Sequence, residues 1–299
     1  MTTFCGIELA HPIVNGSGTF DAIAARRAFG DALLERFPFA AFVSKTVTVE
    51  PRGGNPAPRL WETPAGLINS IGLPNKGLRG YLEQDLPKLA ELPVPLIVNV
   101  MGFTREEVAT LVDAFAQREE VAALELNVSC PNVETGLIMG ADPSETAKLV
   151  ERVRPLTTKP VIVKLTPNTT DVGAVAEAAE AAGADALSLI NTLKGMALHP
   201  RGDGSPWLGG GTGGLSGPAV RAIALAQVRE VASRCRLPIV GMGGVQTAHH
   251  ARDFLQAGAT LVGVGTESFR DPLAAARIAA ELGFETAASR SFSLQNTHR

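Results

Sequence analysis

Short runs of apolar and β-branched residues recur along the chain with little alternation between apolar and polar positions. Such uninterrupted runs are typical of strands that are buried on both faces of a parallel sheet. Alanine-rich segments with helical spacing of their apolar positions lie between most of these runs. The pattern predicts eight strands, at residues 12–15, 41–46, 95–100, 122–128, 160–166, 185–191, 238–242 and 260–265.

Local signals predict where the helices between these strands begin and end. Thr104 is a suitable N-cap, and Glu107 stands three residues later, as in a capping box. Two helical segments end in Ala-Gly-Ala, with Gly183 and Gly258 just past the helix, where glycine is favoured. The expected helices span residues 104–118, 142–154, 171–182, 217–234, 247–257 and 271–282.

Eight strands alternating with helices predict an α/β fold, a single-domain (β/α)8 TIM barrel. An open doubly wound sheet is the alternative, and the count of eight favours the barrel. The long connections at 47–94, 129–142 and 193–218 are expected as loops over the carboxyl ends of the strands, where such barrels build their sites. We expect the barrel domain to span residues 1–284, followed by a polar C-terminal tail at 285–299.

Composition and charge exclude several classes of protein. Lysine and arginine number 27 against 30 acidic residues, a formal charge of −3, so no basic face for nucleic acid or membrane is expected. The sequence has neither a signal-peptide pattern nor an apolar run long enough to span a membrane, and we expect a soluble cytoplasmic protein. Its three cysteines, Cys5, Cys130 and Cys235, are too few and too dispersed for a zinc or iron–sulfur site, so no metal is expected.

Amides, lysines and small residues stand at the carboxyl ends of the predicted strands. They include Lys45, Asn99, Asn127, Lys164 and Asn191. The carboxyl ends of barrel strands meet at one face, so these side chains are expected to lie together. A buried lysine is costly unless it has a partner or a ligand. The pattern therefore predicts a binding site at this end of the barrel.

Two glycine clusters have different interpretations. Gly243 and Gly244 follow the seventh strand, and Gly265 and Thr266 end the eighth, each before a helix. Backbone N–H groups at this place in barrels often bind phosphate, so we expect a phosphate site here. The run at 209–214 formally matches GxGxxG but follows Pro-Trp-Leu rather than a strand, so we interpret it as a mobile loop and not a dinucleotide fingerprint.

Cys130 is the candidate catalytic base. It lies just past the fourth strand, followed by Pro131 and Asn132, which places it in a loop at the barrel mouth. A partly exposed thiol there acts as a base if its pKa is lowered. None of the five histidines falls at a strand end, and Ser129 is the neighbouring residue that would share this role.

Over nearly its whole length the sequence resembles dihydroorotate dehydrogenase. The resemblance is closest to class 1B, the NAD-linked catalytic subunit of a two-protein enzyme; the fumarate-using class 1A is the alternative. Cysteine at 130, where the membrane-bound class 2 enzymes have serine, favours class 1, and ETGLIMGADP at 134–143 favours class 1B. The matching stretches are NGSG at 15–18, SKT at 44–46, GNPAPRLWE at 54–62, NSIGLPN at 69–75, ELNVSCPNV at 125–133, VKLTPN at 163–168, INTLKGMA at 190–197, GGLSGPA at 213–219, GMGGV at 241–245 and VGT at 264–266.

The resemblance implies one FMN over the barrel mouth and oxidation of (S)-dihydroorotate to orotate in pyrimidine biosynthesis. Cys130 would remove the C5 proton while the C6 hydride passes to flavin N5. The implied substrate-binding residues are Lys45, Asn69, Ser70, Ile71, Gly72, Leu73, Asn127, Asn191 and Thr192. The implied FMN-binding residues are Ser17, Lys45, Thr46, Asn99, Asn127, Lys164, Ile190, Gly217, Gly243, Gly244, Gly265 and Thr266.

The resemblance also implies partners. A second subunit carrying FAD and a [2Fe-2S] cluster would pass electrons to NAD, in a heterotetramer built around a catalytic homodimer. Two other functions on the same barrel stay open. One is a Schiff-base lyase with Lys164 or Lys45 as nucleophile. The other is a non-catalytic sensor of a phosphate-bearing ligand.

Overall fold

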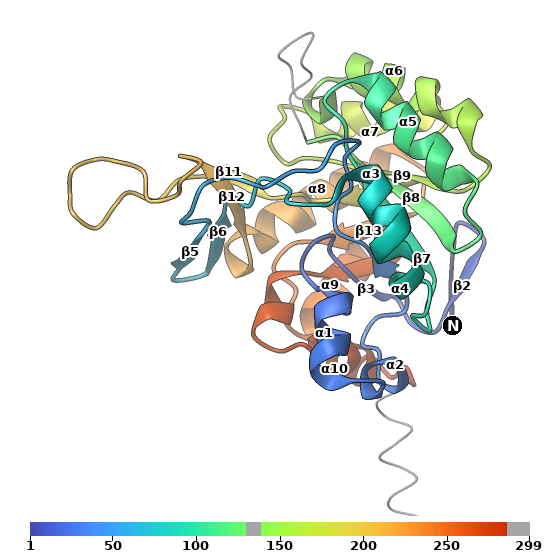
Figure 1. Cartoon of the computed structure of the whole chain (residues 1–299), viewed down its shortest axis with the longest axis horizontal. Helices are drawn as coiled ribbons and strands as arrows, with labels where there is room; N and C mark the ends of the chain where they lie inside the picture. Colours follow the sequence, from blue (N-terminus) through green and yellow to red (C-terminus); the bar gives the residue numbers. More distant parts are fainter. Residues whose placement is uncertain (130–138, 286–299) are drawn as a thin grey trace, which may run out of the picture.

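The computed structural model describes residues 1–129 and 139–285 and has a parallel eight-stranded sheet at its centre (Figure 1). Seven of its strands lie within the predicted ranges, and β8 begins one residue earlier than predicted. The strands follow one another around the sheet in the order β3 (Ile13–Asn15), β14 (Leu261–Val264), β13 (Ile239–Met242), β10 (Ala186–Leu189), β9 (Val161–Lys164), β8 (Val121–Asn127), β7 (Leu96–Val100) and β4 (Phe42–Val43).

A side chain joins the two ends of this sheet, β3 and β4. Asn15 Nδ2 donates to the Val43 carbonyl at 2.8 Å, and Asn15 Oδ1 accepts from Val43 N at 2.8 Å. The Ala40 amide donates to the Ile13 carbonyl at 3.0 Å. These bonds replace ladder bonds across the seam, so the predicted barrel is confirmed and the open-sheet alternative is wrong.

Helices cover the outside of the barrel: α5 (Arg105–Ala116), α6 (Pro143–Val153), α7 (Val172–Ala181), α8 (Arg221–Arg234), α9 (Ala248–Ala257) and α10 (Ala274–Glu281). The Thr104 hydroxyl accepts from Glu107 N at 3.1 Å, as predicted, and Gly258 ends α9 with φ of 114°. Helix α8 begins later than predicted because residues Pro218–Val220 form a 3-10 turn.

The first two βα connections also contain helices that the sequence pattern did not predict. These are α1 (Ala22–Phe29), α2 (Ala32–Glu35), α3 (Gly77–Gly80) and α4 (Leu86–Leu89). A π-helical turn, Tyr81–Asp85, joins the last two.

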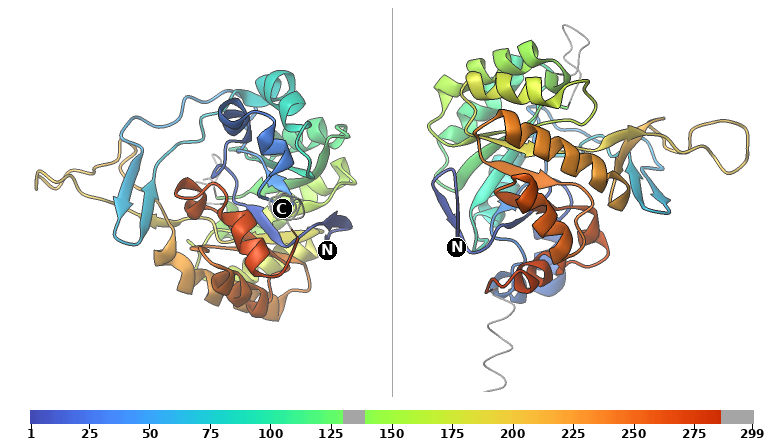
Figure 2. Two further views of the ribbon diagram at one scale, coloured as in Figure 1. Left: turned by 90° about the horizontal axis from the view of Figure 1, so that it is seen from below. Right: turned by 180° about the vertical axis from the view of Figure 1, so that it is seen from behind.

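A second sheet stands to one side of the barrel, as Figures 1 and 2 show. It is antiparallel, in the order β11 (Leu193–Gly195), β12 (Gly213–Ser216), β6 (Gly66–Asn69) and β5 (Leu60–Thr63). These strands occupy stretches that were expected to be loops. The loop interpretation of the glycine-rich run is wrong for Gly213 and Gly214, which pair with Gly195, Lys194 and Asn69.

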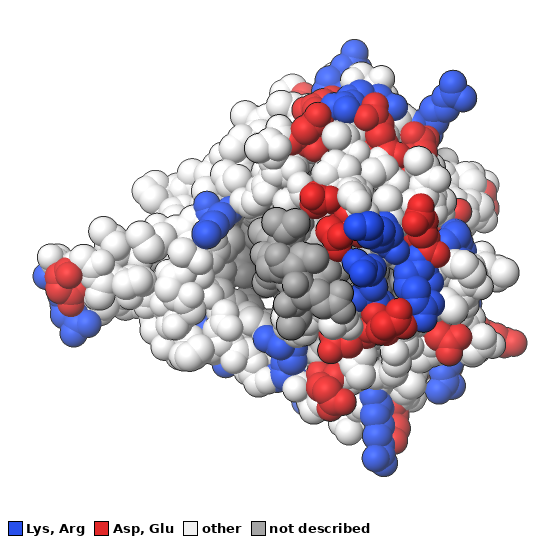
Figure 3. Space-filling view, turned by 90° about the horizontal axis from the view of Figure 1, so that it is seen from above, with Lys and Arg blue, Asp and Glu red and all other residues white. Residues whose placement is uncertain are grey.

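Charged side chains of both signs are interspersed over the face seen in Figure 3. Many form ion pairs on the outer helices; Arg234, for example, lies 2.7 Å from both Asp171 and Glu177. Exposed pairs of this kind contribute little to stability, typically about 0–1 kcal/mol each. On this face the distribution agrees with the small net charge of the chain.

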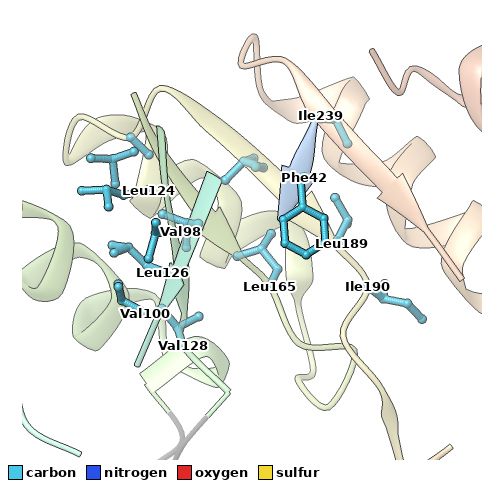
Figure 4. Close-up of a cluster of buried hydrophobic side chains, with 14 of the residues drawn as sticks. Phe42, Val98, Val100, Leu124, Leu126, Val128, Leu165, Leu189, Ile190 and Ile239 are labelled. Atoms are coloured by element: carbon cyan, nitrogen blue, oxygen red, sulfur yellow. The ribbon is translucent and has the colours of Figure 1, made fainter. Parts of the chain in front are cut away.

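Successive residues of each barrel strand point alternately outward and inward. On β7 and β8, Val98, Val100, Leu124 and Leu126 face the helices and belong to the large core layer drawn in Figure 4. The inward positions nearest the strand starts are also apolar and form a separate buried cluster, made by Val14, Val43, Ile97, Ala123, Ile162, Ala186, Val240 and Leu261.

A short hairpin fills the amino-terminal end of the barrel. It consists of β1 (Thr2–Phe4) and β2 (Ile7–Leu9), and Phe4 and Leu9 are buried in the inner apolar cluster. Within residues 1–129 and 139–285, this end of the barrel is thus filled by apolar side chains, and the carboxyl end is the one that opens into a cavity.

The predicted division at residue 284 stays a prediction, since nearly all of the expected tail lies outside the described residues. Among the described residues, no helix combines the length and the apolar character needed to cross a bilayer.

The pKa of His11 provides a test of how well the amino-terminal end of the barrel excludes water. It is buried just before β3, and its Nδ1 accepts from Ile13 N at 3.3 Å. Burial lowers the pKa of His11 from 6.5 to about 4. The folded state therefore keeps His11 neutral, and stability is lost as pH falls from 6.5 toward 4, because the unfolded chain binds the proton first.

We expect the wild-type protein to lose about 2 kcal/mol more unfolding free energy between pH 7 and pH 5 than His11→Asn. Asparagine retains an acceptor for the Ile13 amide but does not titrate, so the difference isolates the imidazole. Urea unfolding at the two pH values measures it. Equal losses in the two proteins would show that His11 titrates normally in the folded state.

Candidate functional site

A cavity of about 540 Å³ opens at the carboxyl ends of the barrel strands. Its size lies within the range of about 300–1,000 Å³ that is usual for ligand sites. Side chains from the second sheet, including Leu67, Asn69 and Leu215, line one side of it. Two exposed apolar residues, Leu60 and Phe269, also belong to its lining. The second sheet therefore turns the shallow end of a barrel into a deep pocket.

On β7, β8, β9 and β10 the inward-facing positions change from apolar to polar. One inward position beyond the apolar cluster, the side chains are Asn99 on β7, Glu125 on β8, Lys164 on β9 and Ser188 on β10. Strand register places Asn99 opposite Glu125 and Ser188 opposite Lys164. We call these four residues the polar layer; all four are buried.

Glu125 connects the members of the polar layer. Its Oε1 accepts from Asn99 Nδ2 at 2.6 Å, and its Oε2 accepts from Ser188 Oγ at 2.8 Å. Lys164 Nζ lies 3.7 Å from Oε1 and forms a buried ion pair with it. Asn99 Oδ1 is buried without a hydrogen-bond partner, which is costly unless a ligand donates to it.

Amide groups are also fixed at the mouth of the cavity. Asn191 Nδ2 donates to Ser129 Oγ at 2.8 Å and to Asn127 Oδ1 at 3.3 Å, while Asn191 Oδ1 accepts from Thr192 N at 2.8 Å. These four residues all line the cavity. Because Asn191 is held on both ends of its amide, the rim offers oriented donors and acceptors to a planar polar ligand.

The two lysines of the cavity have different electrostatic settings. Lys164 is buried and paired with Glu125, whereas Lys45 is exposed and has no carboxylate partner among residues 1–129 and 139–285. An ammonium without a counter-charge attracts an anionic ligand group. Lys45 is therefore the residue best placed to bind a carboxylate at the rim.

At Gly243 and Gly244, neighbouring atoms lie so close to the backbone that a side chain would collide with them. A Cβ atom at Gly243 would lie 2.6 Å from Ala224 Cβ, and one at Gly244 would lie 2.7 Å from the Gly217 carbonyl. Gly244 also has φ of +68°, which disfavours any other residue. These glycines line the cavity beside Thr266, where the backbone can approach a phosphate without an intervening side chain.

The structure brings most of the residues predicted from sequence into this one cavity. Those that line it are Ser17, Lys45, Thr46, Asn69, Ile71, Leu73, Asn127, Lys164, Ile190, Asn191, Thr192, Gly217, Gly243, Gly244, Gly265 and Thr266. Their individual roles stay predictions.

Three predicted residues do not belong to the cavity lining. Ser70 Oγ accepts from Asn55 Nδ2 at 2.9 Å, and a Cβ at Gly72 would meet the same asparagine at 2.4 Å. Both residues therefore lie against Asn55 and not against the cavity. Asn99 belongs to the polar layer beneath the cavity. Cys130, the candidate base, lies outside the described residues.

Sequence reasoning missed Glu125, although it lies in the middle of a predicted strand. A usable signal was present: it occupies an inward position between Ala123 and Asn127 in an otherwise apolar segment. A charge at such a position must have buried partners.

Known proteins resemble the chain over most of its length. A family model described as dihydroorotate dehydrogenase matches residues 1–285. Proteins named dihydroorotate dehydrogenase B (NAD(+)), catalytic subunit, are 46% identical in Citrifermentans bemidjiense and in Geobacter sulfurreducens, over 278 and 281 residues. Each alignment covers 93% of this chain and 90% of the relative. The relative of the same name from Geobacillus kaustophilus is 46% identical over 278 residues, covering 93% and 87%.

The glycine cluster gives a direct test of the cavity wall. Gly244→Ala should lower the free energy of unfolding by about 1–2 kcal/mol or more, because it forces a side chain into a left-handed conformation and against backbone. Chemical denaturation of the protein without added ligand measures this change.

Gly16→Ala is the matched control, since Gly16 lines the same cavity but its Cβ would meet neighbouring atoms no closer than 3.6 Å. We expect its unfolding free energy to stay within about 0.5 kcal/mol of wild type. Equal stability of the two variants would contradict the close backbone packing at Gly244.

Proposed function

This chain belongs to the dihydroorotate dehydrogenase family, and we propose that it oxidises (S)-dihydroorotate to orotate with a bound FMN, in de novo pyrimidine biosynthesis. The observation that carries the proposal is one cavity with three matched parts: a glycine-lined end, a buried lysine in its floor and a rim of oriented amides. These parts suit the phosphate, the ring system and a polar substrate respectively.

The residues of the cavity fit FMN. Gly217, Gly243, Gly244, Gly265 and Thr266 would hold the phosphate through backbone N–H groups and a hydroxyl. Beneath the cavity, the unpartnered Asn99 Oδ1 is an acceptor that suits an imide N–H such as a flavin carries. When bound, FMN supplies the acceptor for the hydride that leaves the substrate, and this hydride carries both electrons of the oxidation.

Other predicted FMN contacts surround the same space. They are Ser17, Lys45, Thr46, Asn127 and Ile190, all of which line the cavity. Lys164 would place a positive charge near the flavin, where negative charge increases on reduction. Its buried position makes that charge effective, because little water is present to screen it.

Substrate binding would use the rim. Lys45 would bind the carboxylate of dihydroorotate, and the amides of Asn69, Asn127 and Asn191 would pair with its ring amide groups. Thr192, Ile71 and Leu73 complete this part of the cavity wall. Ser70 and Gly72 would act through the loop that carries their neighbours.

Cys130 would act as the catalytic base. In the reaction the C5–H and C6–H bonds break and a C5=C6 double bond forms. The Cys130 sulfur would take the C5 proton, and the hydride would leave the adjacent carbon, C6. Ser129 lies next to Cys130, but its hydroxyl is a poorer base and already accepts a hydrogen bond from Asn191.

A Schiff-base lyase is less well supported. A nucleophilic lysine must be neutral when it attacks. Lys164 instead lies 3.7 Å from the buried Glu125 carboxylate, which stabilises the charged ammonium. The paired amides at the rim also have no evident purpose in that chemistry.

We further propose that a partner subunit carries the electrons from FMN to NAD through FAD and a [2Fe-2S] cluster. The support is the printed name of the relatives, which specifies NAD(+) and a catalytic subunit. The three cysteines of this chain are fewer than the four that such a cluster normally requires. The proposed assembly is a heterotetramer around a catalytic homodimer, and the cytoplasmic location stays a prediction.

Substitution of Cys130 tests the proposed mechanism. Cys130→Ala should bind FMN normally but lose most of its turnover, by at least about 100-fold, the usual contribution of general base catalysis. Cys130→Ser should retain slight activity with a higher pH optimum, because a hydroxyl is the weaker base. Orotate formation followed across a pH range measures both. Wild-type rates in Cys130→Ala would remove this residue from the mechanism.

The electron acceptor is tested separately. After anaerobic reduction by dihydroorotate, the isolated chain should be reoxidised slowly by NAD, and rapidly only when the co-expressed partner is present. Fumarate should have little effect. Rapid reoxidation by fumarate with no partner present would assign the chain to the class 1A type.

A further inference from the structure

Glu125 is a buried carboxylate that none of the proposed binding or catalytic steps uses. It is 2% exposed and contacts side chains from three different strands, Asn99 on β7, Lys164 on β9 and Ser188 on β10. Both of its oxygens accept a hydrogen bond. No other carboxylate in the described part of the chain lies among the inward-facing residues of the barrel strands.

Stability alone does not account for this arrangement. Burying a carboxylate and an ammonium costs more than their attraction usually returns, and apolar residues of similar size are often at least as stable in such positions. One inward position nearer the strand starts, the same strands carry Ile97, Ala123, Ile162 and Ala186, so apolar filling is accommodated there. The charge pair is placed only where the barrel meets the cavity.

Glu125 determines how the two neighbouring groups face the cavity floor. An ionised carboxylate only accepts hydrogen bonds, so Asn99 must turn its NH2 group toward Glu125 at 2.6 Å. The Asn99 oxygen is thereby directed elsewhere, and it is the buried atom without a partner. Lys164, which lines the cavity, has Glu125 as its counter-charge.

We propose that Glu125 is a positioning residue that keeps Asn99 Oδ1 available to the flavin and partly cancels the charge of Lys164, which lowers the midpoint potential of bound FMN. This inference rests on the proposed function. Reduction makes the flavin more negative, so each positive charge nearby favours the reduced form. Glu125 opposes the effect of Lys164 and makes the flavin a better electron donor to a subsequent acceptor.

The charges of Glu125 and Lys164 predict the direction in which each variant shifts the midpoint potential of bound FMN. The net charge of the Glu125–Lys164 pair is zero in wild type and in the double variant. It is +1 in Glu125→Gln and −1 in Lys164→Met. Glutamine retains the shape, and it accepts from Asn99 with its oxygen and donates to Ser188 with its nitrogen. The substitution therefore changes charge while leaving the hydrogen-bond network satisfied.

The experiment measures the midpoint potential of FMN bound to the purified chain, by equilibration with a reference dye of known potential. Glu125→Gln should raise the ratio of reduced to oxidised flavin at fixed potential by about tenfold, equivalent to about 30 mV for a two-electron couple. Ser188→Ala is the matched control. It removes one hydrogen bond from the same carboxylate but no charge, and should change the ratio by less than about threefold.

The Lys164 background covers the case in which Glu125→Gln does not fold. Adding Glu125→Gln to Lys164→Met removes an unpaired buried carboxylate and should raise the potential relative to Lys164→Met alone. An unchanged or lower midpoint potential in Glu125→Gln would overturn the inference. An equal shift of the potential in Ser188→Ala would overturn it too. In both cases the proposed function would stand. A wild-type chain that binds no FMN would overturn the proposed function as well.

Discussion

In a parallel barrel the inward side chains of the strands stack in layers, and this constraint organises the molecule. Below the level of Asn99 and Glu125 the inward positions are apolar, and the amino-terminal hairpin fills the remaining space. Beyond it, at the carboxyl ends of the strands, a cavity opens. On β7, β8, β9 and β10, one step of two residues thus separates the packed core from the polar layer beneath the binding site.

The same arrangement separates the two lysines by environment. Lys164 is fixed by the strand register among buried groups and has a counter-charge. Lys45 stands on a connection, is exposed, and has no carboxylate partner within the described ranges. The fixed and partly compensated charge of Lys164 suits a neighbouring group whose electron density changes during a reaction. The accessible charge of Lys45 suits the binding of an anion from solvent. The two roles proposed for these residues follow from where the fold places them.

Much of the fold follows from the sequence because the barrel strands are uninterrupted apolar runs with clear glycine and N-cap boundaries. The second sheet was not predictable in that way. Strands β6 and β12 pair although they lie far apart in the chain, and β12 consists of Gly-Gly-Leu-Ser, which lacks the β-branched residues that mark a strand. Most predicted site residues were found in the cavity because strand ends of a barrel converge. Ser70 and Gly72 were not, because inclusion in a matching stretch does not determine which way a residue faces.

The central claim is that this cavity holds FMN and that dihydroorotate reduces it there. The most direct measurement is an anaerobic titration of the FMN-loaded chain with dihydroorotate, in the absence of any electron acceptor. The account predicts that the visible flavin absorbance is lost with one equivalent of substrate per bound FMN, and that an equal amount of orotate appears. A flavin that stays oxidised in the presence of excess dihydroorotate would contradict it.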